Sequence, residues 1–289
     1  MKDKILVIGV GFLGQILVDQ LKENDISVVG TTSKNFNGNR FFLDITDLDT
    51  IEKSIRSFKP NIIVNCAATT NIDYLESHSE IAFSINSFGP KNLAMVCKKY
   101  DIKLIHISTD SVFDGKDSLY SEKNVPNPIN IYNKSKVLGE QIIIENLSNY
   151  IIIRTNFFGI NNNGKFILNS ILKTLSEKKV FVGFDDVFWN PLEITNLTQM
   201  IIELINIKFT GIIHLSSNEI ISKYQFALYV AKAFNLDSKL VHRGSRNYLS
   251  MTPRPNNTSL SNTKAKNLLR TKIIPVDISL KKLMQKSSN

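Results

Sequence analysis

Residues 4–17 read KILVIGVGFLGQIL, an apolar run that passes through closely spaced glycines into a segment with helical spacing. The loop Gly9-Val10-Gly11-Phe12-Leu13-Gly14 is a G-x-G-x-x-G pattern at a strand–turn–helix junction. In such a loop the first glycine permits a tight turn, the second lets a pyrophosphate approach, and the third lets the helix pack on the strand. Free N–H groups at the helix N-terminus attract the phosphates. We therefore predict a dinucleotide-binding loop that includes Phe12 and Leu13; a glycine-rich turn without a ligand is the alternative.

Short apolar runs alternate with longer amphipathic segments through the first half of the chain. The runs lie at residues 4–8, 26–30, 41–43, 62–65, 104–108 and 151–154, and helical spacing occurs at 13–21, 48–58, 81–100 and 132–146. Continuously apolar strands indicate burial on both faces of a parallel sheet. We therefore predict an α/β fold, a doubly wound parallel sheet of the Rossmann type.

The regular alternation of apolar runs and amphipathic segments ends after Phe158. We expect a helix at 166–175, a short strand at 180–182, and helices near 224–234 and 263–269, while a helix at 194–207 and a strand at 212–215 return to the main sheet. The predicted division is an NAD(P)-binding domain of residues 1–158 plus 194–216 and a smaller substrate-binding lobe of residues 159–193 plus 217–289. This C-terminal lobe should close over the strand ends.

Composition excludes several classes of protein. Hydrophobic residues make up 43% and charged residues 21% of 289 residues, which is typical of a globular protein. Cys66 and Cys97 lie in apolar runs and are expected to be buried, reduced thiols. No membrane span or signal peptide is visible, so we expect a cytoplasmic protein. The net charge of +9 is scattered, so nucleic-acid binding is not predicted, no membrane insertion is expected, and the four dispersed histidines predict no metal site. The sequence does not decide the oligomeric state, and a homodimer is possible.

The segment Gly30-Thr31-Thr32-Ser33-Lys34 ends the second apolar run and bears on the choice of cofactor. NAD-specific sites place a carboxylate here for the ribose hydroxyls, whereas this chain has hydroxyls and a cation. These groups suit a 2′-phosphate, which favours NADPH, with NADH as the alternative. Asp44 follows the third run, next to Ile45, and is a candidate for binding the adenine amino group or for capping the next helix.

Tyr132 and Lys136 are spaced i and i+4, so on a helix they share one face. A nearby ammonium favours the phenolate and should lower the pKa of the tyrosine. The spacing alone occurs by chance in many helices. Here, however, it follows Ser108-Thr109-Asp110 at the tip of the fifth strand, and ligands of parallel sheets bind at the carboxyl ends of strands. Thr109, Tyr132 and the glycine loop are therefore expected to meet in one crevice.

Taken together, these motifs resemble the extended short-chain dehydrogenase/reductase family, and more narrowly its dTDP-4-dehydrorhamnose reductases and other sugar-nucleotide enzymes. The resemblance covers nearly the whole chain. Beyond the glycine loop it is carried by residues 64–68, Asn86, 108–113, 127–136, Gly139-Glu140, 154–157 and 254–257.

The resemblance implies hydride transfer from NADPH to the C4 ketone of a nucleotide-linked 4-dehydro-6-deoxy sugar, of the dTDP-4-dehydro-L-rhamnose to dTDP-L-rhamnose type, in polysaccharide precursor synthesis. Tyr132 would protonate the forming alkoxide, Lys136 would hold the nicotinamide ribose, and Thr109 would hydrogen-bond the carbonyl oxygen. It implies further cofactor contacts at Ala67, Ala68 and Thr69, and sugar-nucleotide contacts at Asp110, Asn156, Phe157, Trp189 and Arg254. Magnesium assists some relatives, but nothing in this sequence indicates a requirement.

Several positions depart from the family pattern. Ile8 replaces the first glycine of the extended glycine motif, Ser111 replaces a tyrosine, Phe157 replaces a tryptophan, and residues 188–192 replace a smaller sequence. The sugar is therefore open, and a 4-ketoreductase with a talose- or fucose-type product is an alternative. Asp110-Ser111 replaces the Asp-Glu pair of dehydratases, and residues 31–34 do not favour the bound NAD of epimerases. A non-catalytic subunit, like the regulatory beta subunit of methionine adenosyltransferase, also remains open.

Overall fold

The computed structural model describes residues 3–33, 41–161, 166–246 and 252–287. At its centre is a seven-stranded sheet with the order β11-β6-β5-β4-β1-β2-β3, in which neighbouring strands are parallel. The strands are β1 (Lys4–Ile8), β2 (Ser27–Thr32), β3 (Phe41–Phe42), β4 (Ile62–Asn65), β5 (Lys103–Thr109), β6 (Tyr150–Thr155) and β11 (Gly211–Leu215). The predicted doubly wound parallel sheet is confirmed.

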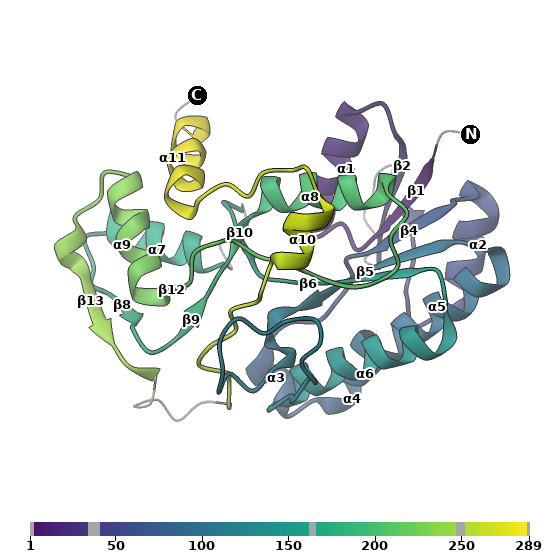
Figure 1. Ribbon diagram of the computed structural model, residues 1–289, viewed down its shortest axis with the longest axis horizontal. Coiled ribbons are helices and arrows are strands. Elements are labelled where there is room, and N and C mark those ends of the chain that lie inside the picture. The colour runs from purple at the N-terminus through teal and green to yellow at the C-terminus, as the bar shows by residue number, and fades with distance from the viewer. Residues whose placement is uncertain (1–2, 34–40, 162–165, 247–251, 288–289) are drawn as a thin grey trace.

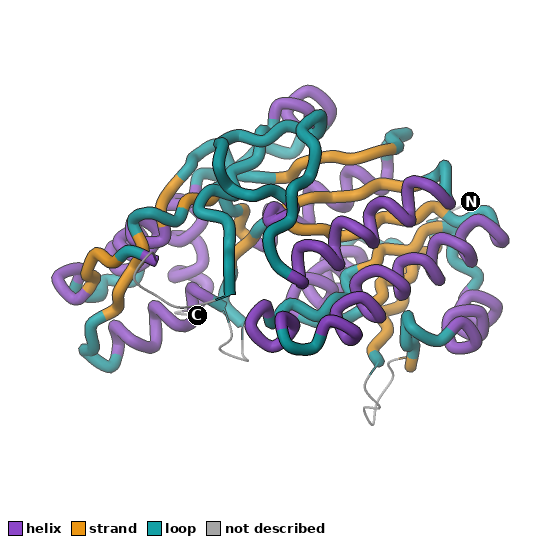
Figure 2. The backbone as a smooth tube through the Cα atoms, turned by 90° about the horizontal axis from the view of Figure 1, so that it is seen from below, coloured by secondary structure: helices purple, strands orange, loops and turns teal. Residues whose placement is uncertain are grey.

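Helices cover both faces of this sheet (Figures 1 and 2). One face carries α1 (Phe12–Glu23), α8 (Ile194–Asn206) and α10 (Thr263–Leu268), and the other carries α2 (Leu48–Phe58), α5 (Gly89–Tyr100) and α6 (Ile131–Asn146). Each face has its own apolar core, so the middle strands are buried on both sides. This explains why their sequences are continuously apolar.

A second lobe lies at the left of Figure 1, beyond the carboxyl ends of the strands. It contains the parallel pair β8 (Phe181–Phe184) and β13 (Val241–Gly244), the antiparallel pair β9 (Phe188–Trp189) and β12 (Ile221–Ser222), and the helices α7 (Ile167–Ser176), α9 (Lys223–Ala233) and α11 (Val276–Ser287). Phe158, Trp189 and Phe226 are among the buried side chains of its core. The link between the lobes includes the two-residue pair β7 (Phe157–Phe158) and β10 (Leu192–Glu193).

The helix predicted at 81–100 is interrupted in the structure. It consists of α4 (Ser79–Phe83), a π-helical turn at Ser84–Phe88, and α5. Within this turn, the Asn86 side chain accepts a hydrogen bond from Thr69 N and donates one to Thr69 O, both at 3.0 Å. The apolar spacing of the segment continues through the turn, so the sequence did not reveal this tertiary contact.

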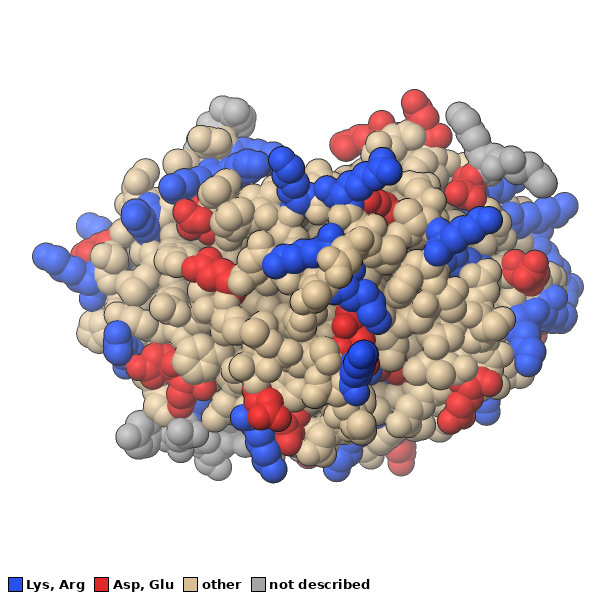
Figure 3. Space-filling view, viewed as in Figure 1, with Lys and Arg blue, Asp and Glu red and all other residues tan. Residues whose placement is uncertain are grey.

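The carboxyl end of β1 lies where the strand order reverses, since β1 is flanked by β4 on one side and β2 on the other. Such a reversal opens the crevice in which doubly wound sheets bind ligands. On the face seen in Figure 3, lysine and arginine side chains are spread widely with acidic side chains between them. Cys66 and Cys97 are both free thiols; Cys97 is buried, as predicted, but Cys66 is only partly so. None of the described helices has the length and apolarity to cross a membrane.

Candidate active site

The glycine loop makes a tight turn between β1 and α1. Gly9 has φ +86°, and the amides of Gly9 and Val10 both donate to Thr31 O, at 3.2 and 3.0 Å. A Cβ on Gly9 would lie 2.6 Å from Ala67 Cα, and one on Gly14 would lie 2.3 Å from Gly9 O. Both glycines are therefore required by close packing, as the pattern predicted.

The start of α1 is suited to a phosphate. Gly11 is its N-cap, no side chain caps the helix, and the first turn contains no acidic residue. A Cβ on Gly11 would meet no atom within 4 Å, so the backbone here borders open space. The amides of the first turn of α1, which have no acceptor within the helix, and the positive end of the helix dipole thus fit the pyrophosphate of a dinucleotide.

These two kinds of glycine should respond differently to alanine. Gly14→Ala is expected to lower both NADPH affinity and the midpoint of thermal unfolding, because its Cβ overlaps a backbone oxygen; overpacking of this kind costs about 1–3 kcal/mol. Gly11→Ala should weaken NADPH binding about tenfold or more at an unchanged melting midpoint, since the methyl group enters only ligand space. Fluorescence titration and thermal melts would measure both. Normal NADPH affinity in Gly11→Ala would contradict the placement of the phosphates.

The predicted contacts for the rest of the cofactor lie on neighbouring strand ends. Thr31 is fully buried and its hydroxyl has no hydrogen-bond partner among the described residues, Thr32 ends β2, and Ser33 follows it; Lys34 lies outside the described residues. Ala67, Ala68 and Thr69 follow β4, where Asn86 holds Thr69 and Ala67 abuts Gly9. The structure thus brings the β2 and β4 ends to the glycine loop.

Asp44 and Ile45 play local structural roles in the described fold. The Asp44 carboxylate accepts hydrogen bonds from Thr46 N at 2.9 Å and Thr46 Oγ1 at 2.7 Å. The N-cap of α2 is Asp47, so Asp44 does not cap that helix. Ile45 is buried in the core beside Gly89. Their predicted contacts with the cofactor stay predictions.

Tyr132, Lys136 and Thr109 lie close together at the carboxyl end of β5. Tyr132 stands in the first turn of α6, whose N-cap Asn130 accepts from Asn133 N at 2.8 Å, and its phenol is hydrogen-bonded to the Thr109 hydroxyl. One turn further, Lys136 Nζ donates to Ile107 O at 2.8 Å and lies 3.2 Å from His106 Nε2. All three predicted catalytic side chains are at least nine-tenths buried.

Burial sets the pKa values of this group. It raises the pKa of Tyr132 to about 12, although the Thr109 hydrogen bond acts in the opposite direction. It lowers the pKa of Lys136 to about 8, against the negative charge of Glu140. The expectation that Lys136 lowers the pKa of Tyr132 is wrong for this structure, because the ammonium points to Ile107 and His106 and desolvation of the phenol dominates. A phenol that keeps its proton suits an acid that must donate one.

These pKa values predict how a reduction at this site depends on pH. Tyr132 keeps its proton across the neutral range, whereas Lys136 loses its charge as the pH rises through about 8. The kcat/KM for a ketone substrate should therefore be flat at neutral pH and fall about tenfold per pH unit above that value. Rates measured at pH 6 to 10 with saturating NADPH would test it, and a flat profile to pH 10 would exclude an essential Lys136 ammonium.

Sequence reasoning missed the support beneath Lys136. His106 is fully buried, and its Nδ1 lies 3.0 Å from Asn65 Nδ2, while Asn65 Oδ1 accepts from Ala67 N at 3.1 Å. Burial and the nearby Lys136 charge lower the pKa of His106 well below its usual value, so the ring is neutral. A histidine inside an otherwise apolar strand, two positions before Ser108, was the signal available in the sequence.

Asp110 is a buried acceptor next to Thr109, the predicted catalytic threonine. Its carboxylate accepts hydrogen bonds from Ser111 Oγ at 3.0 Å and from Asn156 Nδ2 at 2.8 Å, and Thr258 also donates to it. Desolvation raises the pKa of Asp110, and these hydrogen bonds oppose the rise. Two predicted substrate contacts, Asp110 and Asn156, are therefore joined directly.

A cavity of 340 Å³ extends from this point between the lobes. Arg254, which lines it together with the predicted contact Asn156, donates to Asp73 Oδ2 at 2.7 Å, and its buried Nε has no partner among the described residues. Several lining residues were not predicted, and they come mostly from the second lobe. These are Ile72, Ser111, Ile167, Phe181, Val182, Gly183, Phe184, Val187, Lys223, Arg246, Pro255 and Thr258.

The other predicted sugar contacts, Asp110, Phe157 and Trp189, are not among the described residues that line this cavity. Phe157 packs in an aromatic group with Phe12 and Phe166, at centroid distances of 6.3 and 6.2 Å. Trp189 is 2% exposed, packs edge-on against Phe226, and has Lys223 Nζ over its ring. The structure thus places Trp189 behind Lys223, in the core of the second lobe.

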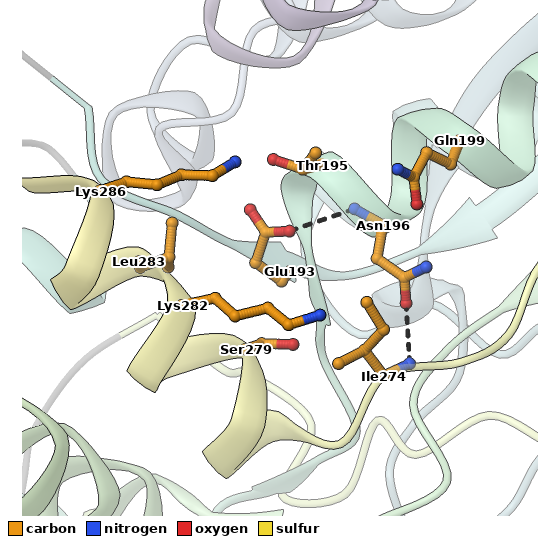
Figure 4. Close-up of a pocket in the computed structure, with 9 residues that line it drawn as sticks. All are labelled: Glu193, Thr195, Asn196, Gln199, Ile274, Ser279, Lys282, Leu283 and Lys286. Atoms are coloured by element: carbon orange, nitrogen blue, oxygen red, sulfur yellow. Dashed lines mark hydrogen bonds between the residues drawn. The ribbon is translucent and has the colours of Figure 1, made fainter.

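A second cavity, of 260 Å³, lies between α8 and α11 and shares no residue with the predicted site. Figure 4 shows Glu193 accepting a hydrogen bond from Asn196 N, and Asn196 in turn accepting one from Ile274 N. These bonds tie the start of α8 to the segment that leads into α11. Among the described residues, no group of three or more His, Cys, Asp or Glu side chains is arranged to hold a metal ion.

Comparison with known proteins places this geometry in a family. Residues 3–289 match the family model described as the RmlD substrate binding domain. The fold superposes with a TM-score of 0.91 on a dTDP-4-dehydrorhamnose reductase from Bacillus anthracis str. Ames in complex with NADP, at 26% identity and covering 99% of this chain and 100% of that one.

Two similar proteins have names that indicate different roles. The Bacillus subtilis (strain 168) spore coat polysaccharide biosynthesis protein SpsK is 32% identical, over 89% of each chain. Methionine adenosyltransferase 2 subunit beta of Xenopus laevis is 29% identical, over 88% of this chain and 78% of its own length. The family match spans nearly the whole chain, so this protein belongs to the RmlD substrate binding domain family.

Proposed function

We propose that this protein is an NADPH-dependent reductase of the C4 ketone of a nucleotide-linked 4-dehydro-6-deoxy sugar, of the dTDP-4-dehydro-L-rhamnose type. The observation that carries the proposal is the buried Tyr132–Thr109 hydrogen bond with Lys136 one turn below, at the strand edge that also presents the glycine loop. The NADP complex of the Bacillus anthracis relative supports the cofactor, and its name supports the substrate class.

Each side chain has a separate task in the proposed reaction. NADPH bound along the glycine loop supplies the hydride. Thr109 and Tyr132 both hydrogen-bond the ketone oxygen, and Tyr132 gives it the phenolic proton as negative charge develops there. Lys136, fixed by Ile107 O, presents its ammonium to the cofactor ribose. We assign the cofactor to the sheet domain and the sugar nucleotide to the 340 Å³ cavity with its second-lobe wall.

The decisive experiment follows NADPH consumption at 340 nm with a panel of 4-keto-6-deoxy sugar nucleotides. We expect turnover of at least one dTDP-linked member and none with the free nucleotide. Titration with NADH and NADPH tests the cofactor, because equal affinities would remove the role given to Thr31, Thr32, Ser33 and Lys34 in binding a 2′-phosphate.

A second candidate function is supported by the relationship to methionine adenosyltransferase 2 subunit beta. Under that proposal the chain binds NADPH but acts by docking to a partner protein. The same panel separates the two, since bound NADPH that no sugar nucleotide oxidises would favour the binding subunit.

A further inference from the structure

Lys223 enters the site from the second lobe on a fixed backbone. It is the first residue of α9, directly after the N-cap Ser222. Ser222 Oγ accepts from Gln225 N at 3.0 Å and Gln225 Oε1 accepts from Ser222 N at 3.1 Å, which completes a capping box. The Lys223 amide donates to Val187 O at 3.0 Å. The start of the helix, and with it the root of the lysine side chain, is therefore tied in place.

The ammonium of Lys223 has an unusual set of neighbours. It lies over the face of the Trp189 ring, 2.8 Å from the centroid, and the residue lines the 340 Å³ cavity. Burial lowers the pKa of Lys223 well below its usual value, and the negative charge of Asp110 opposes this shift, yet among the described residues no carboxylate oxygen comes within 4.0 Å of Nζ to form an ion pair. The contact with the Trp189 ring is an electrostatic attraction and does not use the N–H groups of Lys223 as conventional hydrogen-bond donors. Lys223 can therefore donate hydrogen bonds to a ligand that occupies the cavity.

The position of Lys223 relative to the reacting group limits what it can touch. Asp110 follows Thr109 in the chain, and Thr109 is hydrogen-bonded to Tyr132. A sugar whose ketone oxygen is held by Thr109 and Tyr132 would therefore place the substituent on the adjacent ring carbon beside Asp110 and Lys223. Because Asp110 already supplies a negative charge there, a carboxylate on the sugar would be repelled, whereas a hydroxyl could accept from the ammonium and donate to the carboxylate.

We propose that Lys223 is a specificity-determining residue that donates a hydrogen bond to the hydroxyl next to the reacting ketone. This inference rests on the proposed function for the location of the ketone. In this proposal Trp189 does not contact the sugar itself. It packs against Phe226 and positions the Lys223 side chain at the cavity. A buried donor left without its acceptor is costly, so the site should discriminate against sugars that lack this hydroxyl.

Equilibrium binding of Lys223→Met tests the proposal without turnover. Methionine is one atom shorter than lysine but keeps an unbranched side chain that can pack on Trp189, and it removes the donor. We expect affinity for a dTDP-hexose whose sugar carries no charged group to fall about 10- to 100-fold, while affinities for free dTDP and NADPH stay within about twofold. Lys232→Met, an exposed position on the same helix, is the matched control and should change none of them. Lys223→Gln keeps a neutral donor, so its affinity for the dTDP-hexose should lie between those of the unaltered protein and Lys223→Met. This second variant keeps the test valid if Lys223→Met folds poorly.

A substrate analogue makes the test specific. A dTDP-sugar without the hydroxyl next to C4 should bind the unaltered protein as weakly as the normal sugar binds Lys223→Met, and the variant should not distinguish the two sugars. Equal weakening of free dTDP would show that Lys223 binds the diphosphate and would overturn the inference. The inference would also be overturned if the unaltered protein bound the dTDP-sugar no more tightly than free dTDP. Because NADPH consumption is measured separately, a chain that shows the sugar-dependent loss but reduces no ketone would refute only the proposed function.

Discussion

Tyr132→Phe is expected to lower kcat for the ketone substrate by about 10²- to 10⁴-fold while NADPH affinity stays within about twofold. In the proposed reaction the phenol protonates the alkoxide, since its pKa of about 12 keeps it protonated at neutral pH and Thr109 holds it in place. Phenylalanine retains the ring, which is 9% exposed and packed against Leu75 and Ala82, so the helix and the cofactor loop should be undisturbed. The loss should therefore fall on the chemical step.

Tyr120→Phe provides the control for this substitution. Tyr120 is also buried, and its hydroxyl donates to Asp114 Oδ1 at 2.9 Å, but it belongs to a different apolar cluster from Tyr132. Its loss should lower the melting midpoint and leave kcat unchanged. Steady-state rates at saturating NADPH, with a fluorescence titration of NADPH, separate the two effects. Full activity of Tyr132→Phe would exclude Tyr132 as the acid, and a parallel loss of NADPH affinity would indicate a positioning role.

The sheet was predictable because each strand carries its own signal. The run at 104–108 became β5, Lys103–Thr109, with only the ends shifted, since burial on two faces requires apolar residues at successive positions. The π-helical turn at Ser84–Phe88 has no such local signal. It depends on Asn86 holding the loop after β4 and on Gly139 of α6, where a Cβ would lie 2.2 Å from Asn86 O.

The site was predictable to the extent that it follows from the sheet. The carboxyl ends of parallel strands share one edge, so Thr109, the glycine loop and the residues after β4 had to converge. The wall contributed by the second lobe does not follow in this way. Trp189 and Lys223 meet because the two-residue strands β9 and β12 pair antiparallel, with Ile221 opposite Trp189, and such short pairs leave no periodicity in the sequence. The pKa of Tyr132 could not be predicted from the spacing of Tyr132 and Lys136 either, because it depends on burial.

Glu140→Gln is expected to destabilise the fold by about 3–5 kcal/mol, the usual cost of leaving one partner of a buried ion pair without the other. Arg154 Nη2 lies 2.6 Å from Glu140 Oε2, and both side chains are at most 3% exposed. Ser108 also donates to this carboxylate, whereas Arg154 Nη1 has no partner among the described residues. Glutamine keeps the shape of the side chain but removes the charge that compensates the guanidinium.

A double variant distinguishes the charge from the packing. Glu140→Gln with Arg154→Met removes both charges, so its loss of stability should be clearly smaller than the sum of the two single losses. Urea unfolding of the four proteins gives the coupling energy directly. Glu177→Gln, which breaks the exposed Lys179–Glu177 pair, should leave the unfolding midpoint unchanged. Additive losses at 140 and 154 would mean that the two side chains are held by their other contacts.

The same substitution tests whether this ion pair affects the proposed reaction. The negative charge of Glu140 raises the pKa of Lys136 and so opposes the effect of burial on that ammonium. Removing it should shift the alkaline fall in kcat/KM to a pH below about 8, because Lys136 then loses its proton more readily. A change in stability alone would lower the amount of active protein equally at every pH and leave the midpoint of the profile in place. An unshifted midpoint in folded Glu140→Gln would therefore confine Glu140 to a structural role, whereas a shift toward lower pH would show that the pair also keeps Lys136 charged.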